Sequence, residues 1–479
     1  MNVWYNTRKI LKTLMPCCLC LSMQHFFAGS LAEIVRAQAH CPIILNATDF
    51  GTTGTVIDQP GYYKLCDNVQ FTSGNVTAID IRSSYVTIDM NTKAIYGAGL
   101  DSGITVTTSV HDVVIKDGII SGFDVYGIFV DSGSYKITMK NMNINNATCT
   151  SAIVLNGLSG SPVYESLIDH CKVNAITSNE PIMQCYYCND IKINASCFNN
   201  NICGNSAPFP GIYVVYIESS DKCKFYHCTF NDNEPTSGSY FLQSVYCLTV
   251  SSFEFLDCRF NNNTSSNRLF GIYLQESKGT SIRECTFANN QSEWEYYAIY
   301  DDIGSESDKF CSCVITNNKV SADSNHVAVY GIYVFGGETA TENCYIKDCL
   351  ITKNTAITSG ASRDATSVGI YLGSSSSYHF VGNCTIIDHR ATAGAGGNAV
   401  GIGINNNSTN SVFQQCRVYG NLTYGIYNSV GAIIVGCDSA YNGTNYGGGI
   451  GFVPNSTGVT KLGDNVTNVQ KFENVDISV

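Results

Sequence analysis

The chain has 479 residues, of which 14% are charged and 44% hydrophobic, and its formal net charge is −12. This balance excludes an intrinsically disordered chain, which combines high charge with few apolar residues. No stretch of the sequence forms a basic stripe, which argues against nucleic acid as a partner. The composition instead favours a neutral polar surface that suits sugars or bound cations.

Residues 1–39 are predicted to be a signal peptide. Three basic residues precede a mostly apolar run over residues 14–31, and Ala-Gln-Ala at 37–39 offers a cleavage site. The apolar run is interrupted by polar residues and is shorter than the ~20 residues of a membrane span. A cleaved signal is therefore favoured over an anchor, and no other stretch could cross a bilayer as a helix. We expect an exported protein, located in the periplasm, at the cell surface or outside the cell.

Residues 40–75 are predicted to form an N-terminal cap segment. Cys41 and Cys66 flank this segment, and in an exported protein we expect them to pair as a disulfide. Among the 23 cysteines of the chain, those outside the repeat described below could also pair between coils, but the sequence does not fix their partners.

From residue 76 to residue 452 the chain repeats two patterns. The first is an aliphatic position, usually within Gly-Ile-Tyr or a near copy: Ile104, Ile128, Ile153, Ile182, Ile212, Leu242, Ile272, Ile299, Ile332, Ile370, Ile402, Ile426 and Ile450. The second is a Cys that follows it, with Gly118 and Met142 in the first two turns: Cys171, Cys197, Cys228, Cys258, Cys285, Cys313, Cys349, Cys384, Cys416 and Cys437. From Cys228 onward an Asn lies five residues after almost every Cys, and His389 is the exception.

Such a repeat of strand-like blocks and Asn/Gly turns is typical of a solenoid. Within residues 271–297 apolar and polar residues alternate, so every second side chain should point inward. Equivalent residues of neighbouring coils then lie about 4.8 Å apart, which is wide for a disulfide. The repeated cysteines should therefore be buried thiols. The repeated Asn is expected in a left-handed turn conformation, with side chains that can hydrogen-bond along the axis.

Cys185 and Cys188 form a CxxC pair, with Cys197 and Cys203 close behind. A zinc site would need tighter spacing, so structural packing is favoured and no metal site is predicted.

Two segments carry a family resemblance. Residues 79–81 (Ile-Asp-Ile) and 85–91 (Tyr-Val-Thr-Ile-Asp-Met-Asn), preceded by Gln-Pro-Gly-Tyr-Tyr-Lys-Leu-Cys at 59–66, resemble the first coil and entry segment of right-handed parallel β-helix proteins of the pectin-lyase-like superfamily. The resemblance implies an all-β chain: a single right-handed parallel β-helix of roughly 13 coils over residues 76–452, with an N-terminal cap and a C-terminal tail or cap over residues 453–479.

The same resemblance leaves activity open. The superfamily includes lyases, hydrolases, epimerases, adhesins and phage tail proteins, and fold alone does not choose among them. The catalytic signatures of polygalacturonase-like hydrolases, pectate lyases and mannuronan epimerases do not occur in this sequence.

Three consecutive coils lengthen at one corner, over residues 317–329, 353–367 and 388–398. Insertions of this kind tend to lie on the binding face, so the three loops are predicted to stack into a ridge. Hydrolysis of a glycoside uses two carboxylates, and a lyase or epimerase uses a base with an Arg or a cation such as Ca²⁺. The candidate catalytic residues are Asp301, Asp302, Asp388, His389 and Arg390.

The candidate ligand-binding residues are Asp323, His326, Arg363 and Asp364 of the ridge, with Tyr273, Tyr300, Tyr333 and Tyr371. Outward tyrosines at one position in successive coils would give a platform for sugar rings, although Tyr also favours strands in general. The alternative for the ridge is a set of solvated loop residues.

The first hypothesis is an exported protein that binds polysaccharide or a cell-surface glycan along the tyrosines and the ridge. The second is a polysaccharide lyase, glycoside hydrolase or epimerase, and the third is a structural or adhesion module. No cofactor is predicted, apart from Ca²⁺ if the protein is a lyase, and no oligomeric state is indicated.

Overall fold

A computed structural model describes residues 42–72, 76–204, 211–236, 241–323, 325–337, 339–430 and 432–448. Nearly all of them belong to one compact unit, residues 44–479. The predicted signal peptide, Cys41, Ile450 and the predicted tail 453–479 lie outside the described residues.

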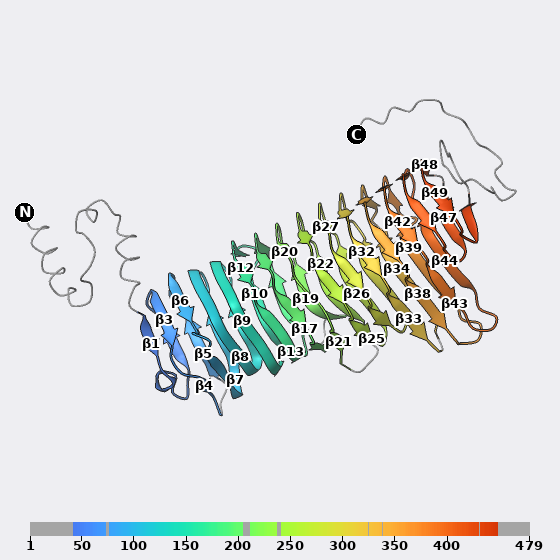
Figure 1. The fold of residues 1–479 in the computed structure, drawn as a ribbon. Helices are drawn as coiled ribbons and strands as arrows, with labels where there is room; N and C mark the ends of the chain where they lie inside the picture. The colour runs from blue at the N-terminus through green and yellow to red at the C-terminus, as the bar shows by residue number, and fades with distance from the viewer. Residues whose placement is uncertain are drawn as a thin grey trace, which may run out of the picture. The chain divides into compact units, whose positions relative to one another are not determined.

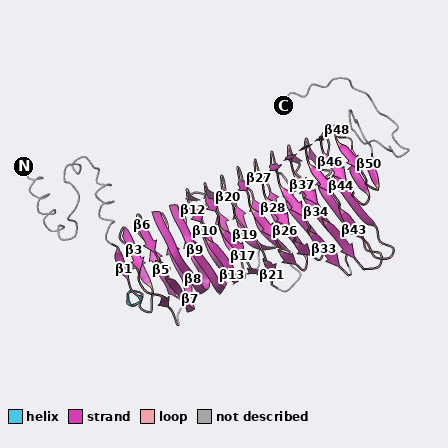
Figure 2. Cartoon of the chain, in the orientation of Figure 1, coloured by secondary structure: helices cyan, strands magenta, loops and turns pink. Residues whose placement is uncertain are grey.

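The unit consists of parallel strands that follow one another around successive coils (Figures 1 and 2). Stack 1 contains β2 (Thr55–Ile57), β5 (Val76–Ile81), β7 (Ala94–Val106), β8 (His111–Val130), β10 (Ser151–Asn156), β14 (Met183–Tyr186), β19 (Ile212–Glu218), β22 (Leu242–Leu248), β26 (Arg268–Gln275), β30 (Glu295–Asp302), β34 (Val327–Val334), β39 (Ala365–Leu372), β44 (Ala399–Asn406), β47 (Tyr424–Asn428) and β50 (Thr444–Gly448). Each strand pairs in parallel with its predecessor and its successor in the stack.

Stack 2 shares the long strand β8 and contains β3 (Gly61–Leu65), β6 (Val86–Asp89), β9 (Tyr135–Cys149), β12 (Leu167–Asp169), β16 (Lys192–Asn194), β20 (Lys224–Tyr226), β23 (Glu254–Leu256), β27 (Ser281–Arg283), β31 (Lys309–Cys311), β36 (Tyr345–Lys347), β41 (Phe380–Gly382), β45 (Val412–Gln414) and β48 (Ile433–Val435). Small strands beside it are β1 (Ile43–Leu45), β11 (Val163–Tyr164), β15 (Cys188–Asn189), β35 (Thr341–Glu342) and β40 (Ser376–Ser377), and one 3-10 helix spans Ala47–Asp49.

Stack 3 continues from β7, β8 and β9 and contains β4 (Val69–Gln70), β13 (Lys172–Ser178), β17 (Cys197–Asn199), β24 (Arg259–Asn261), β28 (Thr286–Ala288), β32 (Val314–Thr316), β37 (Leu350–Thr352), β42 (Thr385–Ile387), β46 (Arg417–Tyr419) and β49 (Asp438–Ala440). Stack 4 contains β18 (Ile202–Cys203), β21 (Glu234–Pro235), β25 (Thr264–Ser265), β29 (Gln291–Ser292), β33 (Lys319–Ala322), β38 (Thr355–Thr358) and β43 (Arg390–Thr392). These parallel stacks confirm the predicted all-β solenoid.

The parallel pairing begins before the predicted boundary at residue 76. Strands β2, β3 and β4 pair with β5, β6 and β7 in the next coil, so the segment predicted as a cap contributes a coil. Cys66 is half-buried and its N–H donates to the carbonyl of Leu45. The predicted disulfide between Cys41 and Cys66 stays a prediction.

One continuous hydrophobic core fills the interior of the coils, from Leu45 to Cys437. Its aliphatic column in stack 1 runs through Ile104, Ile128, Ile153, Met183, Val215, Val245, Ile272, Ile299, Ile332, Ile370, Ile404 and Ile426. The predicted positions Ile182, Ile212, Leu242 and Ile402 are buried too, but they lie one to three residues before the column.

The cysteine column is buried, which confirms the predicted thiols. Each column Sγ lies near a backbone carbonyl one coil earlier, as Cys258 Sγ does at 3.4 Å from the Phe225 oxygen. The place predicted for Cys197 belongs to Ser196, because Cys197 pairs with Lys172, the residue that follows Cys171. Ser196 Oγ accepts the N–H of Cys171 at 3.1 Å.

The asparagine column also lies inside, and its side chains hydrogen-bond from coil to coil. Asn233 Nδ2 donates to Asn263 Oδ1 at 3.1 Å, and Asn263 Nδ2 to Asn290 Oδ1 at 3.1 Å. The predicted left-handed conformation of these residues is wrong. The positive φ belongs to the residue before each Asn, such as Asp232 at 55° and Asn262 at 57°, because the Asn itself must point inward to stack.

Such single left-handed residues form the corners between the stacks. Glu284 has a φ of 56° and separates β27 from β28. A corner of this kind reverses the alternation, so Ile282, Cys285 and Phe287 all point into the core while Arg283 is exposed. The strict alternation predicted for this coil therefore fails at its corners.

Among the described residues, no helix has the length and apolar character that a membrane span requires.

Candidate functional site

Two neighbouring columns of mainly aromatic side chains lie on the outer face of stack 1, from β19 to β39. The first column runs through Tyr213, Gln243, Phe270, Tyr297 and Tyr330, and the second through Tyr216, Tyr246, Tyr273, Tyr300, Tyr333 and Tyr371. Tyr213, Tyr216 and Tyr246 form a hydrophobic cluster of their own, separate from the core. We call these two columns the aromatic face.

The Gly-Ile-Tyr motif explains how these tyrosines reach the outside. At Gly331, an added Cβ would lie 2.5 Å from the carbonyl oxygen of Gly369 and 2.7 Å from Cγ2 of Ile351, so this position requires a minimal side chain. Ile332 is fully buried in the core, while Tyr333 is half-buried and lies in the outer column. One motif thus supplies both the core and the aromatic face.

The rings of the aromatic face pack mainly against each other. The ring centroids of Tyr300 and Tyr333 lie 5.0 Å apart with planes at 6°, and those of Tyr333 and Tyr371 lie 4.5 Å apart at 9°. Tyr297 meets Tyr300 edge-on at 4.9 Å and 86°. Because neighbouring rings cover much of each ring face, the platform predicted for stacked sugars presents mainly ring edges and hydroxyl groups.

Two tyrosine hydroxyls of the second column donate to acceptors at the end of the next strand in the stack. Tyr273 donates to Asp302 Oδ2 at 2.6 Å, and Tyr246 donates to Gln275 Oε1 at 2.6 Å. Burial raises the pKa of the Tyr273 phenol, and so does its hydrogen bond to Asp302. Burial also raises the pKa of Asp302, against the lowering effect of that hydrogen bond. These phenols therefore stay protonated donors at neutral pH.

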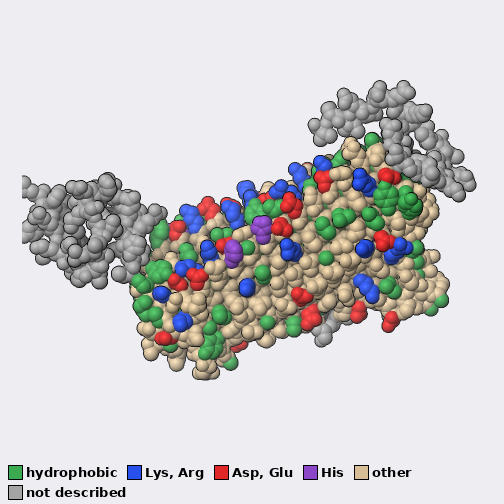
Figure 3. All heavy atoms as spheres, viewed as in Figure 1, with side chains coloured by type: hydrophobic (Ala, Val, Ile, Leu, Met, Phe, Trp, Pro, Cys, Tyr) green, Lys and Arg blue, Asp and Glu red, His purple; other side chains and the backbone are tan. Residues whose placement is uncertain are grey.

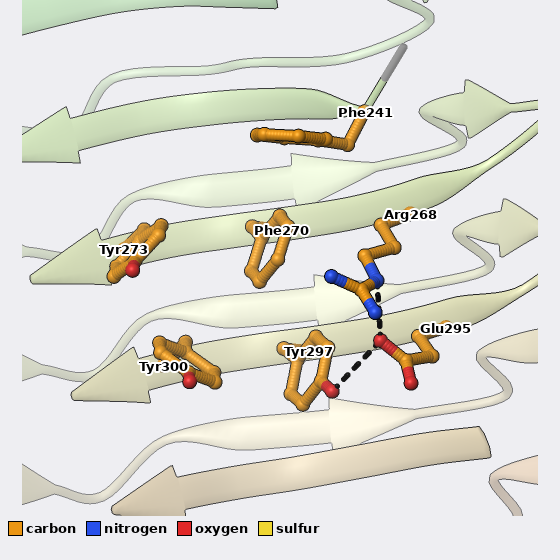
Figure 4. A pocket seen from close by; sticks show the side chains of 7 residues that line it. All are labelled: Phe241, Arg268, Phe270, Tyr273, Glu295, Tyr297 and Tyr300. Carbon is orange, nitrogen blue, oxygen red and sulfur yellow. Dashed lines mark hydrogen bonds and ion pairs between the residues drawn. The ribbon is translucent and has the colours of Figure 1, made fainter. Parts of the chain in front are cut away.

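A depression of about 270 Å³ lies on the aromatic face (Figure 4). It is lined by Phe241, Arg268, Phe270, Tyr273, Glu295, Tyr297 and Tyr300. Arg268 Nε lies 2.6 Å from Glu295 Oε2, which also accepts the Tyr297 hydroxyl at 3.0 Å. The depression thus combines aromatic side chains with one ion pair.

Sequence reasoning missed Arg268 and Glu295. Each lies five residues before a predicted tyrosine, Tyr273 and Tyr300, and the two are in register with each other. Extending the repeat by this fixed offset would have found them.

The predicted acid pair Asp301 and Asp302 is divided between the two sides of β30. Asp301 is fully buried and points into the core, where Cys344 Sγ lies 3.0 Å from its Oδ2. Burial raises the pKa of Asp301 to about 6. The neighbouring carboxyl of Asp308 is also fully buried, and its pKa is raised by burial and by Asp301. Asp301 therefore has no access to a surface ligand.

The predicted triplet at residues 388–390 is divided in the same way. His389 is fully buried in the asparagine column, and burial lowers its pKa to about 4. Asp388 and Arg390 point outward and pair with each other, with Arg390 Nη2 2.5 Å from Asp388 Oδ1. His389 cannot act as a surface base because it is enclosed by the core.

The three lengthened loops do stack beside one another. They extend from β33, β38 and β43, which pair in parallel. Ser359 Oγ donates to Asp323 Oδ1 at 2.8 Å, and the Asp364 N–H donates to His326 Nδ1 at 3.0 Å. Arg363 is exposed. The polar side chains of the ridge thus bind neighbouring loops, and the loops lead into β34, β39 and β44 of stack 1.

In the part of the chain that the structure describes, no three or more His, Cys, Asp and Glu side chains gather closely enough to hold a metal ion. The cysteines of the CxxC pair, Cys185 and Cys188, are both buried and free.

Residues 184–386 match a family model described as a right handed beta helix region. A comparison with curated protein sequences gives no match. Among solved structures, the A-module of mannuronan C-5 epimerase AlgE6 from Azotobacter vinelandii is 11% identical, with a TM-score of 0.42 over 76% of this chain and 97% of that chain.

PfbA, a surface adhesin of Streptococcus pneumoniae, is 10% identical, with a TM-score of 0.40 over 87% of this chain and 93% of that chain. The enzymatically active domain of bacteriophage CBA120 tailspike protein 2 is 14% identical, with a TM-score of 0.37 over 58% of this chain and 47% of that chain. The parallel stacks and the matched region together show the fold of the chain, which is a right-handed parallel β-helix.

Proposed function

We propose that the protein binds a polysaccharide along the aromatic face. The observation that carries this proposal is the second column, which is unbroken from Tyr216 to Tyr371, coil after coil, on the outside of stack 1. A strip that extends over several coils suits an extended polymer better than a small molecule, for which an enclosed pocket is usual.

The chemistry of the strip supports a sugar ligand. Aromatic edges offer apolar contact to the C–H groups of a sugar ring. The hydrogen bonds of Tyr273 to Asp302 and of Tyr246 to Gln275 hold these two hydroxyl groups in fixed positions. Because the rings hold each other in place, little side-chain entropy is lost on binding. The stacked loops that lead into β34 and β39 form one border of this strip.

No observation favours catalysis by the predicted residues. Two carboxyl groups must flank one glycosidic bond for hydrolysis, and Asp301 and Asp302 lie on opposite sides of one strand. Binding without a chemical step is therefore the function that we propose.

The test is retention of the full-length protein in native gels that contain soluble neutral and charged polysaccharides. We expect Tyr333→Ala and Tyr300→Ala to weaken binding to the retained polymer about tenfold, a typical loss for a central interface aromatic. The matched control is Tyr345→Ala, which removes a stacked ring from stack 2. The ring centroids of Tyr345 and Phe380 lie 4.9 Å apart there.

Equal weakening by Tyr345→Ala would contradict a site on the aromatic face. Absence of retention by every polymer would contradict glycan binding and leave a structural module as the better description. Release of new reducing ends or unsaturated sugars from any polymer would identify an enzyme instead.

A further inference from the structure

The aromatic face differs from stack 2 in the sign of its charges. Across β14, β19, β22, β26, β30, β34 and β39 the one basic residue is Arg268, and Glu295 pairs with it at 2.6 Å. Glu218 and Asp302 accept hydrogen bonds from tyrosine hydroxyls on the same face. The carboxylates of the aromatic face therefore outnumber its cations.

Stack 2 carries the basic side chains instead. Its strands β16, β20, β27, β31 and β36 contribute Lys192, Lys224, Arg283, Lys309 and Lys347. Figure 3 shows Lys and Arg side chains, with Asp and Glu side chains between them, along the upper edge, where Figure 1 places β20 and β27. An anionic polymer would thus find its cations on stack 2 and not on the aromatic face.

The hydrogen bonds of the aromatic face also leave acceptors, and not donors, for a ligand. The hydroxyl hydrogens of Tyr216, Tyr273 and Tyr297 are donated to Glu218, Asp302 and Glu295. The phenol oxygen of half-buried Tyr273 therefore offers its lone pairs to a ligand, and Glu295, with 27% of its side chain exposed, offers its remaining acceptor sites. A sugar hydroxyl or an ammonium group can donate to such a surface, whereas a uronate carboxylate or a sulfate can only accept.

Asp302 contributes a poorly solvated negative charge to the aromatic face. Its side chain is only 5% exposed, and its Oδ1 receives no hydrogen bond from any described residue. Its other oxygen, Oδ2, is the acceptor for Tyr273. A carboxylate held in this way repels a second negative charge more strongly than a solvated one would, because water screens it less.

We infer that the aromatic face selects its glycan by charge: it binds polymers whose sugars carry no carboxylate or sulfate, and protonated amino groups strengthen the binding. This inference rests on the proposed function, and it narrows the ligand to neutral and cationic glycans.

Three cellulose ethers with one backbone test it: hydroxyethyl cellulose, carboxymethyl cellulose and quaternary-ammonium cellulose. At low salt we expect the full-length protein to bind the ammonium ether most tightly and the carboxymethyl ether at least about tenfold more weakly. High salt should narrow this difference, because it screens surface charges.

The double variant Glu295→Gln with Asp302→Asn should weaken binding of the ammonium ether severalfold and strengthen binding of the carboxymethyl ether. The matched control is Asp169→Asn with Glu254→Gln, which makes the same change in net charge on β12 and β23 of stack 2. In the control we expect both affinities to stay within about twofold of the parent protein.

Equal effects of the two double variants would overturn the inference, since net charge alone would then explain the order of binding. Tighter binding of the carboxymethyl ether, or no binding of the ammonium ether, would overturn it as well. Those outcomes leave the proposed function intact if Tyr333→Ala still weakens retention of a neutral polymer, and the proposed function fails separately if it does not.

Discussion

At the scale of single residues, two side chains that the sequence suggested as catalytic groups at the surface lie in the interior of the solenoid. His389 replaces an asparagine in a column of hydrogen-bonded amides, and Asp301 replaces an apolar residue between Leu274 and Val334. Both are fully buried. Substitution of either residue should therefore change the free energy of unfolding and not the binding of a ligand.

His389→Asn should stabilise the protein. Asn354 Nδ2 has no hydrogen-bond partner among the described residues, whereas Asn318 Nδ2 donates to Asn354 Oδ1 at 3.0 Å. An Asn at 389 would supply the missing acceptor, and one such hydrogen bond contributes about 1 kcal/mol. The midpoint of urea unfolding should rise accordingly. The reverse change, Asn318→His, should lower it, and a fall with His389→Asn would show that the space left by the imidazole dominates.

The stability of the protein between pH 4 and pH 6 should depend on two opposing sets of buried groups. Burial lowers the pKa of His379 and of His389 to about 4, below the usual value of about 6.5. The unfolded chain then binds more protons than the folded protein in this range, so these groups make stability fall as pH falls. Asp301, with its pKa raised to about 6, keeps a proton that the unfolded chain releases, so it makes stability fall as pH rises.

Asp301→Asn should therefore steepen the rise of stability between pH 4 and pH 6, and His389→Asn should flatten it. Urea midpoints at pH 4, 5, 6 and 7 measure both changes. The control is Glu306→Gln, which alters an exposed carboxyl of the same coil, with 55% of its side chain accessible, and should leave the shape of the curve unchanged. Parallel curves for all variants would contradict the assignment of these groups.

At the scale of strands and corners, the repeat in the sequence predicts which residues stack in columns better than it predicts which side chains point inward or outward. The cysteine and asparagine columns follow from their spacing, because a constant offset must stack in a solenoid. The left-handed residue of each corner does not follow from the spacing, because its type changes from coil to coil: it is Asp232, Asn262 and Lys353 in three different coils. Since the corner type is not fixed, alternation counted from one strand into the next assigns side chains such as Arg283 and His389 to the wrong side.

The cysteine column makes a prediction about thiol reactivity. Apart from Cys66, whose predicted partner Cys41 lies outside the described residues, 18 cysteines are described; Cys197 and Cys311 are half-buried and the rest are buried. Burial raises the pKa of the Cys171 thiol to about 11, which also removes its reactive thiolate.

With a thiol reagent, the native protein should react quickly only at the half-buried cysteines, and the unreduced protein in denaturant should show most of its thiols. Cys311→Ser should lower the rapid native count by one, while Cys258→Ser should not change it. Near-complete pairing in denaturant would contradict the buried column.

At the scale of the whole molecule, the sequence predicts the architecture and the stacking of the lengthened loops. The family resemblance and the lengthened loops led to the correct fold and to stacked loops beside the tyrosines. The contacts between rings could not be predicted, because they depend on the packing of Tyr300 against Tyr333 and of both against the neighbouring column. The ion pair of Arg268 with Glu295 needed the register between two coils.

The pairing of each strand with the coil before it also has a consequence for how the chain folds. Ile128 pairs with Ile104 and Ile153, and Ile332 with Ile299 and Ile370, so every contact of the ladder joins segments that are near in sequence. A newly made coil can dock on its finished neighbour without waiting for distant parts of the chain. Assembly can thus proceed in one direction as the polypeptide emerges, and a pulling force applied to one end would detach the coils in turn.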